Sequence, residues 1–273
     1  MTTMILEEKL GKQRSERLYW ELNQAVKAVP ANEWKQLGKS LLPIYGRLIS
    51  QRVKSLVRFG GKVLRKGGKW ALRGMQAASQ KRLPEFGQEL FSEVKGGVEN
   101  RWQAMKAVAT SWGHFLKNNP REAAPQMVLA LMGFYLGSGG IDGDGGIPDL
   151  DLQAGIGHHR SIATHSVFMA AFIQLLTIAG GEVFDKIYRH LPEPHDALWE
   201  QVKSRMEVLL PTFAGATCLG VAYHLGVDSL IDTGKAYADL PFSASMETHQ
   251  WLMGSQAVAE VLYQKGKKKR EGR

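Results

Sequence analysis

The sequence contains a single cysteine, Cys218, among 273 residues. One cysteine cannot form an internal disulfide, so we expect the protein to fold in a reducing compartment. The cysteine lies within the apolar run FAGATCLGVAY, which indicates a small core residue rather than a nucleophile. The first twenty residues, MTTMILEEKLGKQRSERLYW, lack the continuous apolar segment of a secretory signal, which excludes export by that route. Together these features predict a cytoplasmic protein.

Runs of alternating β-branched residues are also absent. Apolar residues recur instead at the spacing of α-helices, with prolines between the segments. A hydrophobic content of 44% is enough for a globular core. We therefore predict an all-α fold, a helical bundle, with helices over residues 4–28, 33–59, 69–82, 86–117, 123–136, 164–179, 206–231 and 246–264.

None of the apolar runs is a comfortable transmembrane span, for which a helix needs roughly twenty apolar residues. The run VFMAAFIQLLTIA has thirteen residues. A longer run, from Val208 to Ile231, is interrupted by Pro211, His224 and Asp228, and polar groups at that depth in a membrane would have to be functional. We interpret both runs as buried helices, with a membrane-embedded arrangement as the alternative.

The character of the sequence changes after Asn118-Asn119-Pro120, where longer apolar segments begin. This change predicts a basic helical N-terminal region over residues 1–118 and a second helical domain over residues 119–264. The last residues, 265–273, form the basic run KGKKKREGR, which is typical of a disordered tail.

Acidic residues are missing between Trp34 and Pro84, whereas lysine and arginine occur there thirteen times. The net charge of the whole chain is +9, so the rest of the chain is acidic overall. Six of the basic residues fall within an arc of about 80° on a helical wheel: Arg47, Lys54, Arg58, Lys62, Arg65 and Lys69. The opposite side of the wheel carries apolar residues: Ile49, Val53, Leu56, Val57, Val63 and Leu64.

This pattern is typical of an amphipathic helix that lies on anionic lipid or along phosphates. The glycine pairs at 60–61 and 67–68 cost about 1 kcal/mol per glycine relative to alanine, which predicts a helix broken into short pieces. A solvated basic face over the protein's own core is the alternative interpretation. Between the two ligands we favour an anionic phospholipid surface over nucleic acid, because aromatic side chains for stacking on bases are sparse in this region.

The segment GIDGDGGIPDLDLQAGIGHHRSIATHS, residues 140–166, contains four aspartates, three histidines and an arginine. Its DGDGG part is a Gly/Asp-rich loop in which Asp142 and Asp144 are as consistent with turns as with ligands. A calcium loop of the EF-hand type is disfavoured, because the twelfth position from Asp142 is Gln153 instead of glutamate. Asp149 and Asp151 follow Pro148, and we expect an extended PDLD segment that directs both carboxylates to similar sides.

Three histidines complete the segment: His158, His159 and His165. Thr164 is a candidate N-cap for the apolar helix that follows, which would place His165 in its first turn. Neutral imidazole and carboxylate are the ligands that zinc and similar ions take. The histidines and aspartates together therefore favour a site over an ordinary loop.

His224 and Asp228 lie one helical turn apart in an apolar segment. An unpaired charged aspartate there would cost several kcal/mol, so Asp228 needs a partner. A structural hydrogen bond to His224 is one solution, and shared coordination of an ion with the first cluster is the one we favour. We therefore predict a divalent metal site between helices, with zinc first and manganese or magnesium as alternatives, and with ligands drawn from Asp149, Asp151, His158, His159, His165, His224 and Asp228.

The order of three short motifs resembles the YdjM-like, inner-membrane-associated metal-dependent hydrolases. In that family a PD-x-D element, an HR-G-x-THS element and a later H-x-x-x-D element follow one another, and here PDLD, HHRSIATHS and HLGVDS stand in the same order within residues 125–235. The family is similar in turn to the superfamily of zinc-dependent phospholipase C and single-strand nucleases, all-α enzymes that cleave phosphoesters. The resemblance marks Asp149, Asp151, His159, Arg160, His165, His224 and Asp228. The interval before His165 is one residue longer here, which leaves open whether His158 or His159 is the ligand.

Metal-assisted hydrolysis is the chemistry that this resemblance implies. A bound divalent ion lowers the pKa of water from 15.7 to about 7, and Asp149 or Asp151 could bridge ions or accept the proton. Arg160 is suited to clamp a phosphate, or else it forms a salt bridge with a neighbouring aspartate. These three residues are the predicted catalytic groups.

A phosphoester is the predicted substrate, because no H-E-x-x-H protease motif occurs and a basic surface attracts anions. We expect hydrolysis of a phospholipid at an anionic membrane, with the protein bound peripherally at the inner membrane, and nuclease activity as the alternative. Two non-enzymatic alternatives are a lipid- or nucleic-acid-binding module with a structural metal, and an effector that perturbs membranes with its basic helix.

Overall fold

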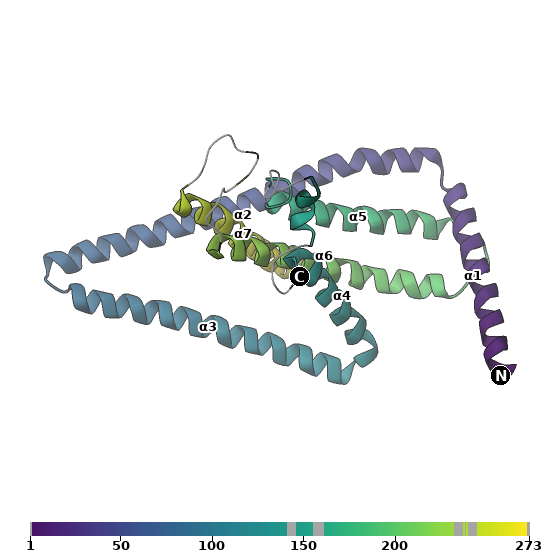
Figure 1. The fold of residues 1–273 in the computed structure, drawn as a ribbon, viewed down its shortest axis with the longest axis horizontal. Coiled ribbons are helices and arrows are strands. Elements are labelled where there is room, and N and C mark those ends of the chain that lie inside the picture. Colours follow the sequence, from purple (N-terminus) through teal and green to yellow (C-terminus); the bar gives the residue numbers. More distant parts are fainter. Residues whose placement is uncertain are drawn as a thin grey trace.

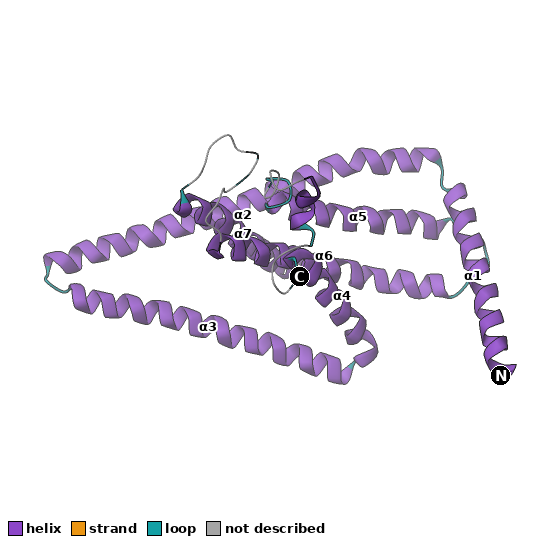
Figure 2. Ribbon diagram, in the orientation of Figure 1, coloured by secondary structure: helices purple, strands orange, loops and turns teal. Residues whose placement is uncertain are grey.

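The computed structural model of the chain describes residues 2–140, 146–154, 161–231, 237, 239 and 245–271. These residues contain no strand, which confirms the predicted all-α fold (Figure 2). The helices, labelled in Figure 1, are α1 (Thr2–Ala28), α2 (Ala31–Ser79), α3 (Leu83–Asn118), α4 (Pro120–Ser138), the 3-10 helix η1 (Pro148–Ala154), α5 (Val167–Arg189), α6 (Leu198–Ile231) and α7 (Met246–Glu271).

α2 is one continuous helix of 49 residues. The prediction that the glycine pairs at 60–61 and 67–68 would break it was wrong. Apart from the helix's own backbone, no described atom lies within 4 Å of the position that a Cβ would take at any of these four glycines. Each glycine costs about 1 kcal/mol, but starting a new helix is itself unfavourable by a factor of about a thousand. Continuing the helix therefore costs no more than interrupting it.

α5, α6 and α7 form the hydrophobic core, with contributions from Met169, Cys218, Leu225 and Met253. Cys218 is fully buried, and this burial raises the pKa of its thiol to about 12. A thiol with this pKa is protonated at neutral pH, which agrees with its interpretation as a core residue.

α4 packs directly against α6 through glycines. A Cβ on Gly137 would lie 2.1 Å from the carbonyl oxygen of Thr217, and a Cβ on Gly220 would lie 2.4 Å from that of Phe134. A Cβ on Gly133, one turn before Gly137, would likewise lie 2.7 Å from the carbonyl oxygen of Phe213. Only glycine allows two helix backbones to approach this closely. The contact brings the C-terminal end of α4 beside His224.

α2 joins this bundle through a buried ion pair. The Arg52 guanidinium is fully buried, and its Nε donates to Glu260 Oε2 on α7 at 2.7 Å. The same guanidinium donates to Gln174 Oε1 on α5 at 3.0 Å. The basic stripe of α2 (Arg47, Lys54, Arg58, Lys62, Arg65 and Lys69) lies on the helix surface and is exposed. One of the thirteen basic residues in this region thus anchors the helix, while the stripe stays in contact with solvent.

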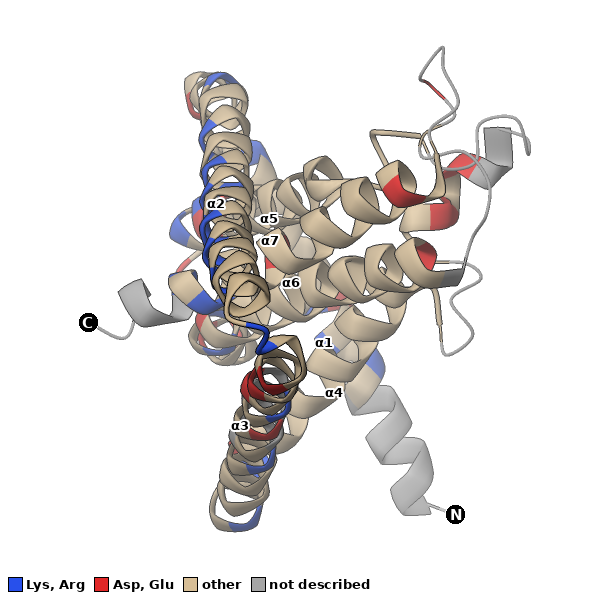
Figure 3. Cartoon of the chain, turned by 90° about the vertical axis from the view of Figure 1, so that its left-hand side faces the viewer, with Lys and Arg blue, Asp and Glu red and all other residues tan. Residues whose placement is uncertain are grey.

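Beyond Arg52, α2 leaves the bundle and returns as α3, which contacts chiefly α2 and α4 near its own two ends (Figures 1 and 3). We call residues 54–118 the arm, and α4 to α7 with η1 the centre. Salt bridges between Arg73 and Glu89 and between Lys66 and Glu93 join the two helices of the arm. Figure 3 shows lysine and arginine along the length of α2. The predicted division of the chain at residue 119 stays a prediction.

Two helices, α5 and residues Leu198–Leu230 of α6, are long and apolar enough to cross a membrane by length and composition. By sequence, the apolar run in α5 is too short for a span at thirteen residues, and Pro211, His224 and Asp228 interrupt the run in α6. Within their most apolar windows, 33% of α5 and 44% of α6 is buried inside the fold. The remaining surface of both helices could therefore allow association with a membrane.

The C-terminal basic run is helical in the described part. α7 continues to Glu271, where the sequence predicted a disordered tail from residue 265. Lysine is a good helix former, and positive charge near the C-terminal end of a helix is favoured by the helix dipole. These two effects account for the extension of α7.

Candidate metal centre

The polar residues of the two sequence clusters meet where η1, the start of α5 and the middle of α6 come together. Asp149 and Asp151 belong to η1, so the PDLD segment is a 3-10 helix and the prediction of an extended segment was wrong. Pro148 accounts for this, because the fixed φ of proline suits the first position of a helix. Likewise Ser166, not Thr164, caps α5 by accepting a hydrogen bond from the amide of Phe168. His165 therefore lies just before the helix.

Asp149, His165 and His224 are buried and form a group that could hold a metal ion. Asp149 Oδ1 lies 3.4 Å from His165 Nε2 and 3.8 Å from His224 Nε2. The two Nε2 atoms are 3.2 Å apart. In a tetrahedral zinc site with bonds near 2.0–2.1 Å, two ligand atoms are about 3.4 Å apart. The three separations therefore match one face of such a site.

The proton positions on His224 follow from its hydrogen bond to α4. Its Nδ1 lies 3.2 Å from the carbonyl oxygen of Ser138, the last residue of that helix. A carbonyl oxygen can only accept, so Nδ1 carries the proton. Ser138 is among the last four residues of α4, whose carbonyl groups have no partner within the helix, and His224 satisfies this one. The lone pair of Nε2 is then directed toward His165 and Asp149.

His165 is oriented in the same sense by Asp151 and Thr164. The Thr164 hydroxyl donates to Asp151 Oδ2 at 2.5 Å, so its oxygen accepts from His165 Nδ1, 3.0 Å away. Asp151 Oδ2 also lies 3.3 Å from His165 Nδ1 and accepts from the amide of Ser161 at 2.8 Å. Both partners of Nδ1 are thus acceptors, and Nε2 again presents its lone pair. A carboxylate behind the distal nitrogen is typical of metal-binding histidines.

Two imidazole lone pairs and a carboxylate oxygen therefore converge in a buried space. Neutral histidines with lone pairs 3.2 Å apart repel each other, and the nearby carboxylate adds negative charge. A cation at their common centre attracts all three groups and thereby offsets their mutual repulsion. The donor set of nitrogen and carboxylate oxygen suits zinc and related divalent ions.

Asp228 lies at the edge of this group. Its Oδ2 is 3.5 Å from His224 Nε2 and 3.8 Å from His165 Nε2, and its side chain is 15% exposed. The backbone carbonyl oxygen of Asp228, near the end of α6, lies 3.0 Å from Nε2 of His249 on α7. His249 is buried and caps a carbonyl group that the helix itself leaves without a partner. This bond fixes the turn of α6 that carries Asp228.

Several residues predicted for the site lie outside the described residues: His158, His159, Arg160, Asp142 and Asp144. The roles assigned to them, including the choice between His158 and His159 as the ligand, stay predictions. Among the described residues, the structure brings together Asp149, His165, His224 and Asp228, and it places Asp151 behind His165.

Four chemical groups that position the ligands were not predicted from the sequence. Gly137 and Gly220 set the approach of α4 to α6, and the small-xxx-small spacing of Gly133 and Gly137 was a signal that could have found this contact. The Ser138 carbonyl has no sequence signature, because any residue supplies the same group. His249 is separated from the motifs by a long segment, so its proximity to Asp228 follows only from the fold.

Comparison of the chain with models of known protein families, with curated proteins and with solved structures finds no match. The resemblance to the YdjM-like hydrolases therefore stays a prediction from the three motifs. What the chain can bind or catalyse has to be argued from its own residues.

Proposed function

We propose that the protein is a zinc-dependent hydrolase that cleaves a phosphoester of an anionic phospholipid at a membrane surface. The observation that carries the proposal is the convergence of His165 Nε2, His224 Nε2 and Asp149 Oδ1 within 3.2–3.8 Å of one another. Each histidine has its Nδ1 committed to a separate acceptor, so both present a lone pair to the same buried point. This is the arrangement that a divalent ion requires.

A bound divalent ion lowers the pKa of water to about 7 and polarises phosphoryl oxygens. In the proposed reaction Asp149, His165 and His224 hold the ion, and Asp151 fixes the orientation of His165. Asp228 Oδ2, on the more exposed side of the group, accepts the proton of the attacking water. The water oxygen forms a bond to phosphorus, the ester P–O bond breaks, and the alcohol leaves with the proton that Asp228 accepted from the water. Arg160 is the proposed clamp for the phosphate.

Two features of the surface support a membrane as the place of action. The basic stripe of α2 is exposed along one side of the helix, and such a stripe is attracted to anionic lipid by about 1 kcal/mol per charge. On the apolar side of the same helix, Val57 and Leu64 are exposed by 68% and 78%. A helix that exposes a basic stripe on one side and aliphatic residues on another is typical of a lipid interface. Nucleic acid would use the basic stripe but leave the aliphatic residues in water.

Hydrolysis of vesicle lipids tests this proposal. Protein loaded with zinc is incubated with vesicles of phosphatidylglycerol or of phosphatidylcholine, and released headgroup or phosphate is measured. We expect release from the anionic vesicles, loss of release on chelation, and recovery when zinc is restored. His224→Ala should abolish release, whereas His114→Ala, an exposed histidine on α3, should leave it unchanged.

Other outcomes would overturn the proposal. Zinc binding without hydrolysis of either lipid would assign a structural metal, and cleavage of single-stranded oligonucleotides alone would assign a nuclease. Leakage of anionic vesicles by His224→Ala at the wild-type rate, with no lipid product from the wild type either, would identify a membrane-perturbing protein instead.

A further inference from the structure

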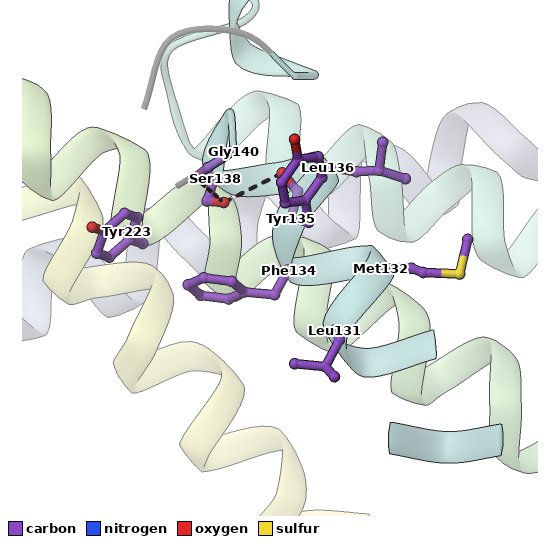
Figure 4. Close-up of a pocket in the computed structure, with 8 residues that line it drawn as sticks. All are labelled: Leu131, Met132, Phe134, Tyr135, Leu136, Ser138, Gly140 and Tyr223. Atoms are coloured by element: carbon purple, nitrogen blue, oxygen red, sulfur yellow. Dashed lines mark hydrogen bonds between the residues drawn. The ribbon is translucent and has the colours of Figure 1, made fainter. Parts of the chain in front are cut away.

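An apolar groove of about 660 Å³ lies on the outer side of α4. Figure 4 shows its lining, in which Leu131, Met132, Phe134, Tyr135 and Leu136 of α4 lie on one side and Tyr223 of α6 on the other. The rings of Phe134 and Tyr223 are 5.6 Å apart between centroids, so the two sides are in aromatic contact there. Among the described residues, none of those that line the groove carries a charged side chain.

One end of the groove lies close to the candidate metal centre. Ser138 and Gly140 complete its lining at the C-terminal end of α4. The Ser138 carbonyl is the acceptor for His224 Nδ1, and Tyr223 in the opposite wall precedes His224 in the chain. The end of the groove is therefore separated from the metal centre by the hydrogen bond between Ser138 and His224 and by the imidazole ring of His224.

The apolar side chains of the groove are exposed to an unusual degree. Leu131, Met132 and Tyr135 are exposed by 62%, 52% and 59%, although α4 also has a closely packed face against α6. A cluster of large apolar side chains at the surface marks a binding site more often than an ordinary surface. The volume lies within the range of small-molecule sites, about 300–1,000 Å³.

We propose that this groove binds a hydrocarbon chain of the substrate, which makes the preferred substrate a long-chain phosphoester with its phosphate at the metal centre. The inference rests on the proposed function for the position of the phosphate. The apolar lining suits the chain, and the donor set around Asp149 suits a cation that attracts the phosphate. Because polar and apolar parts adjoin at Ser138, a single amphiphile satisfies both at once. A second copy of this chain would cover the groove but leave the metal centre without a ligand.

Binding of alkyl phosphates below their critical micelle concentrations tests the groove directly. Butyl and octyl phosphate are titrated by calorimetry into zinc-loaded protein and into protein stripped with chelator. Complete burial of a methylene increases affinity about fourfold, and a groove open on one side should give about half of that free energy, or about twofold. Octyl phosphate should therefore bind at least about tenfold more tightly than butyl phosphate in both preparations.

Leu131→Gln is the test substitution, because Leu131 is largely exposed and its replacement leaves the core intact. It should reduce the ratio of octyl to butyl phosphate affinity severalfold without changing the zinc content. Leu176→Gln is the matched control, since Leu176 on α5 is exposed by 55% and lies outside the groove. This control should keep the wild-type ratio.

The titration separates failure of the groove from failure of the proposed function. A preserved chain-length ratio without hydrolysis of any phosphoester would leave the groove standing and overturn the hydrolase. Hydrolysis with equal affinity for butyl and octyl phosphate would overturn the groove alone. A Leu131→Gln variant that turns a dimer into a monomer, with an unchanged chain-length ratio, would also overturn the proposal and assign the face to a second copy.

Discussion

The centre and the arm use the same residue types in opposite ways. In the centre, Gly137 and Gly220 are pressed against neighbouring backbone, and the charged Glu260 is buried against Arg52 of α2. In the arm, Gly61 has open space around it, and basic side chains such as Lys54 are exposed. Glycine and charge therefore determine helix contacts in the centre, whereas in the arm they leave a long helix accessible to partners.

The largest effect is expected at Arg52, where the arm leaves the centre. Arg52→Leu leaves Glu260 buried without its counter-charge, which should lower the free energy of unfolding by about 3–5 kcal/mol. Lys54→Leu, two residues further along α2 and exposed, should change it little. Urea denaturation measures both. If the two variants lost the same stability, Arg52 would not anchor α2 in the way described.

The same substitution, glycine to alanine, can be made in the centre and in the arm. Gly137→Ala places a Cβ 2.1 Å from the Thr217 carbonyl oxygen, so α4 must move away from α6 at a cost of about 3 kcal/mol. Gly61→Ala has no neighbour within 4 Å and should stabilise α2 by about 1 kcal/mol. Thermal unfolding should therefore shift in opposite directions. Equal shifts would show that the helix contact is looser than 2.1 Å implies.

Asp151→Asn should lower zinc affinity about 10–100-fold, because a carboxylate behind a metal-binding histidine has this effect. Asp185→Asn, at a carboxylate on α5 that forms a surface salt bridge with Arg189, is the matched control and should leave zinc affinity unchanged. Competition with a zinc-sensitive dye measures the affinity. An Asp151→Asn variant that binds zinc like the wild type would remove Asp151 from the account of the site.

The smallest effect concerns α1 and acidic pH. The Arg14 guanidinium, hydrogen-bonded to Asp196, lowers the pKa of that carboxyl from 3.8 to about 2. Because the pKa is lowered by folding, the ionised carboxylate stabilises the fold above about pH 4, and this contribution is lost as the pH falls toward 2. Arg14→Gln should raise the pKa of Asp196 toward 3.8, measured by NMR titration. An unchanged pKa would mean that Asp196 depends on its other contacts.

The residues of the site could be predicted from the sequence more fully than their roles. His224 and Asp228 at helical spacing, with Asp149 and His165 in one short segment, were enough to predict a shared ion. Asp149 faces the candidate metal centre, whereas Asp151 lies behind His165. This difference depends on the 3-10 turn of η1. Residues two apart lie on one side of a strand but point in different directions on a helix.

The sequence predicted most of the helices, but it predicted neither the continuity of α2 nor the way in which α2 packs. A stripe of basic residues was correctly placed on one side, whereas the burial of Arg52 depends on Glu260, more than two hundred residues later in the chain. Per-residue helix propensities also overstated the effect of Gly60 and Gly67, because they do not include the cost of starting a new helix. Long-range partners and cooperativity account for both errors.

The metal content of the purified protein shows whether His165 and His224 bind a divalent ion. Protein purified without chelator is analysed by inductively coupled plasma mass spectrometry, together with His165→Ala, His224→Ala and the exposed control His114→Ala. We expect zinc, or a related divalent ion, in the wild type and in the control, and loss of most of it in the two site variants. A wild-type protein free of divalent metal that also binds none on titration would contradict the account, and so would site variants that hold as much metal as the control.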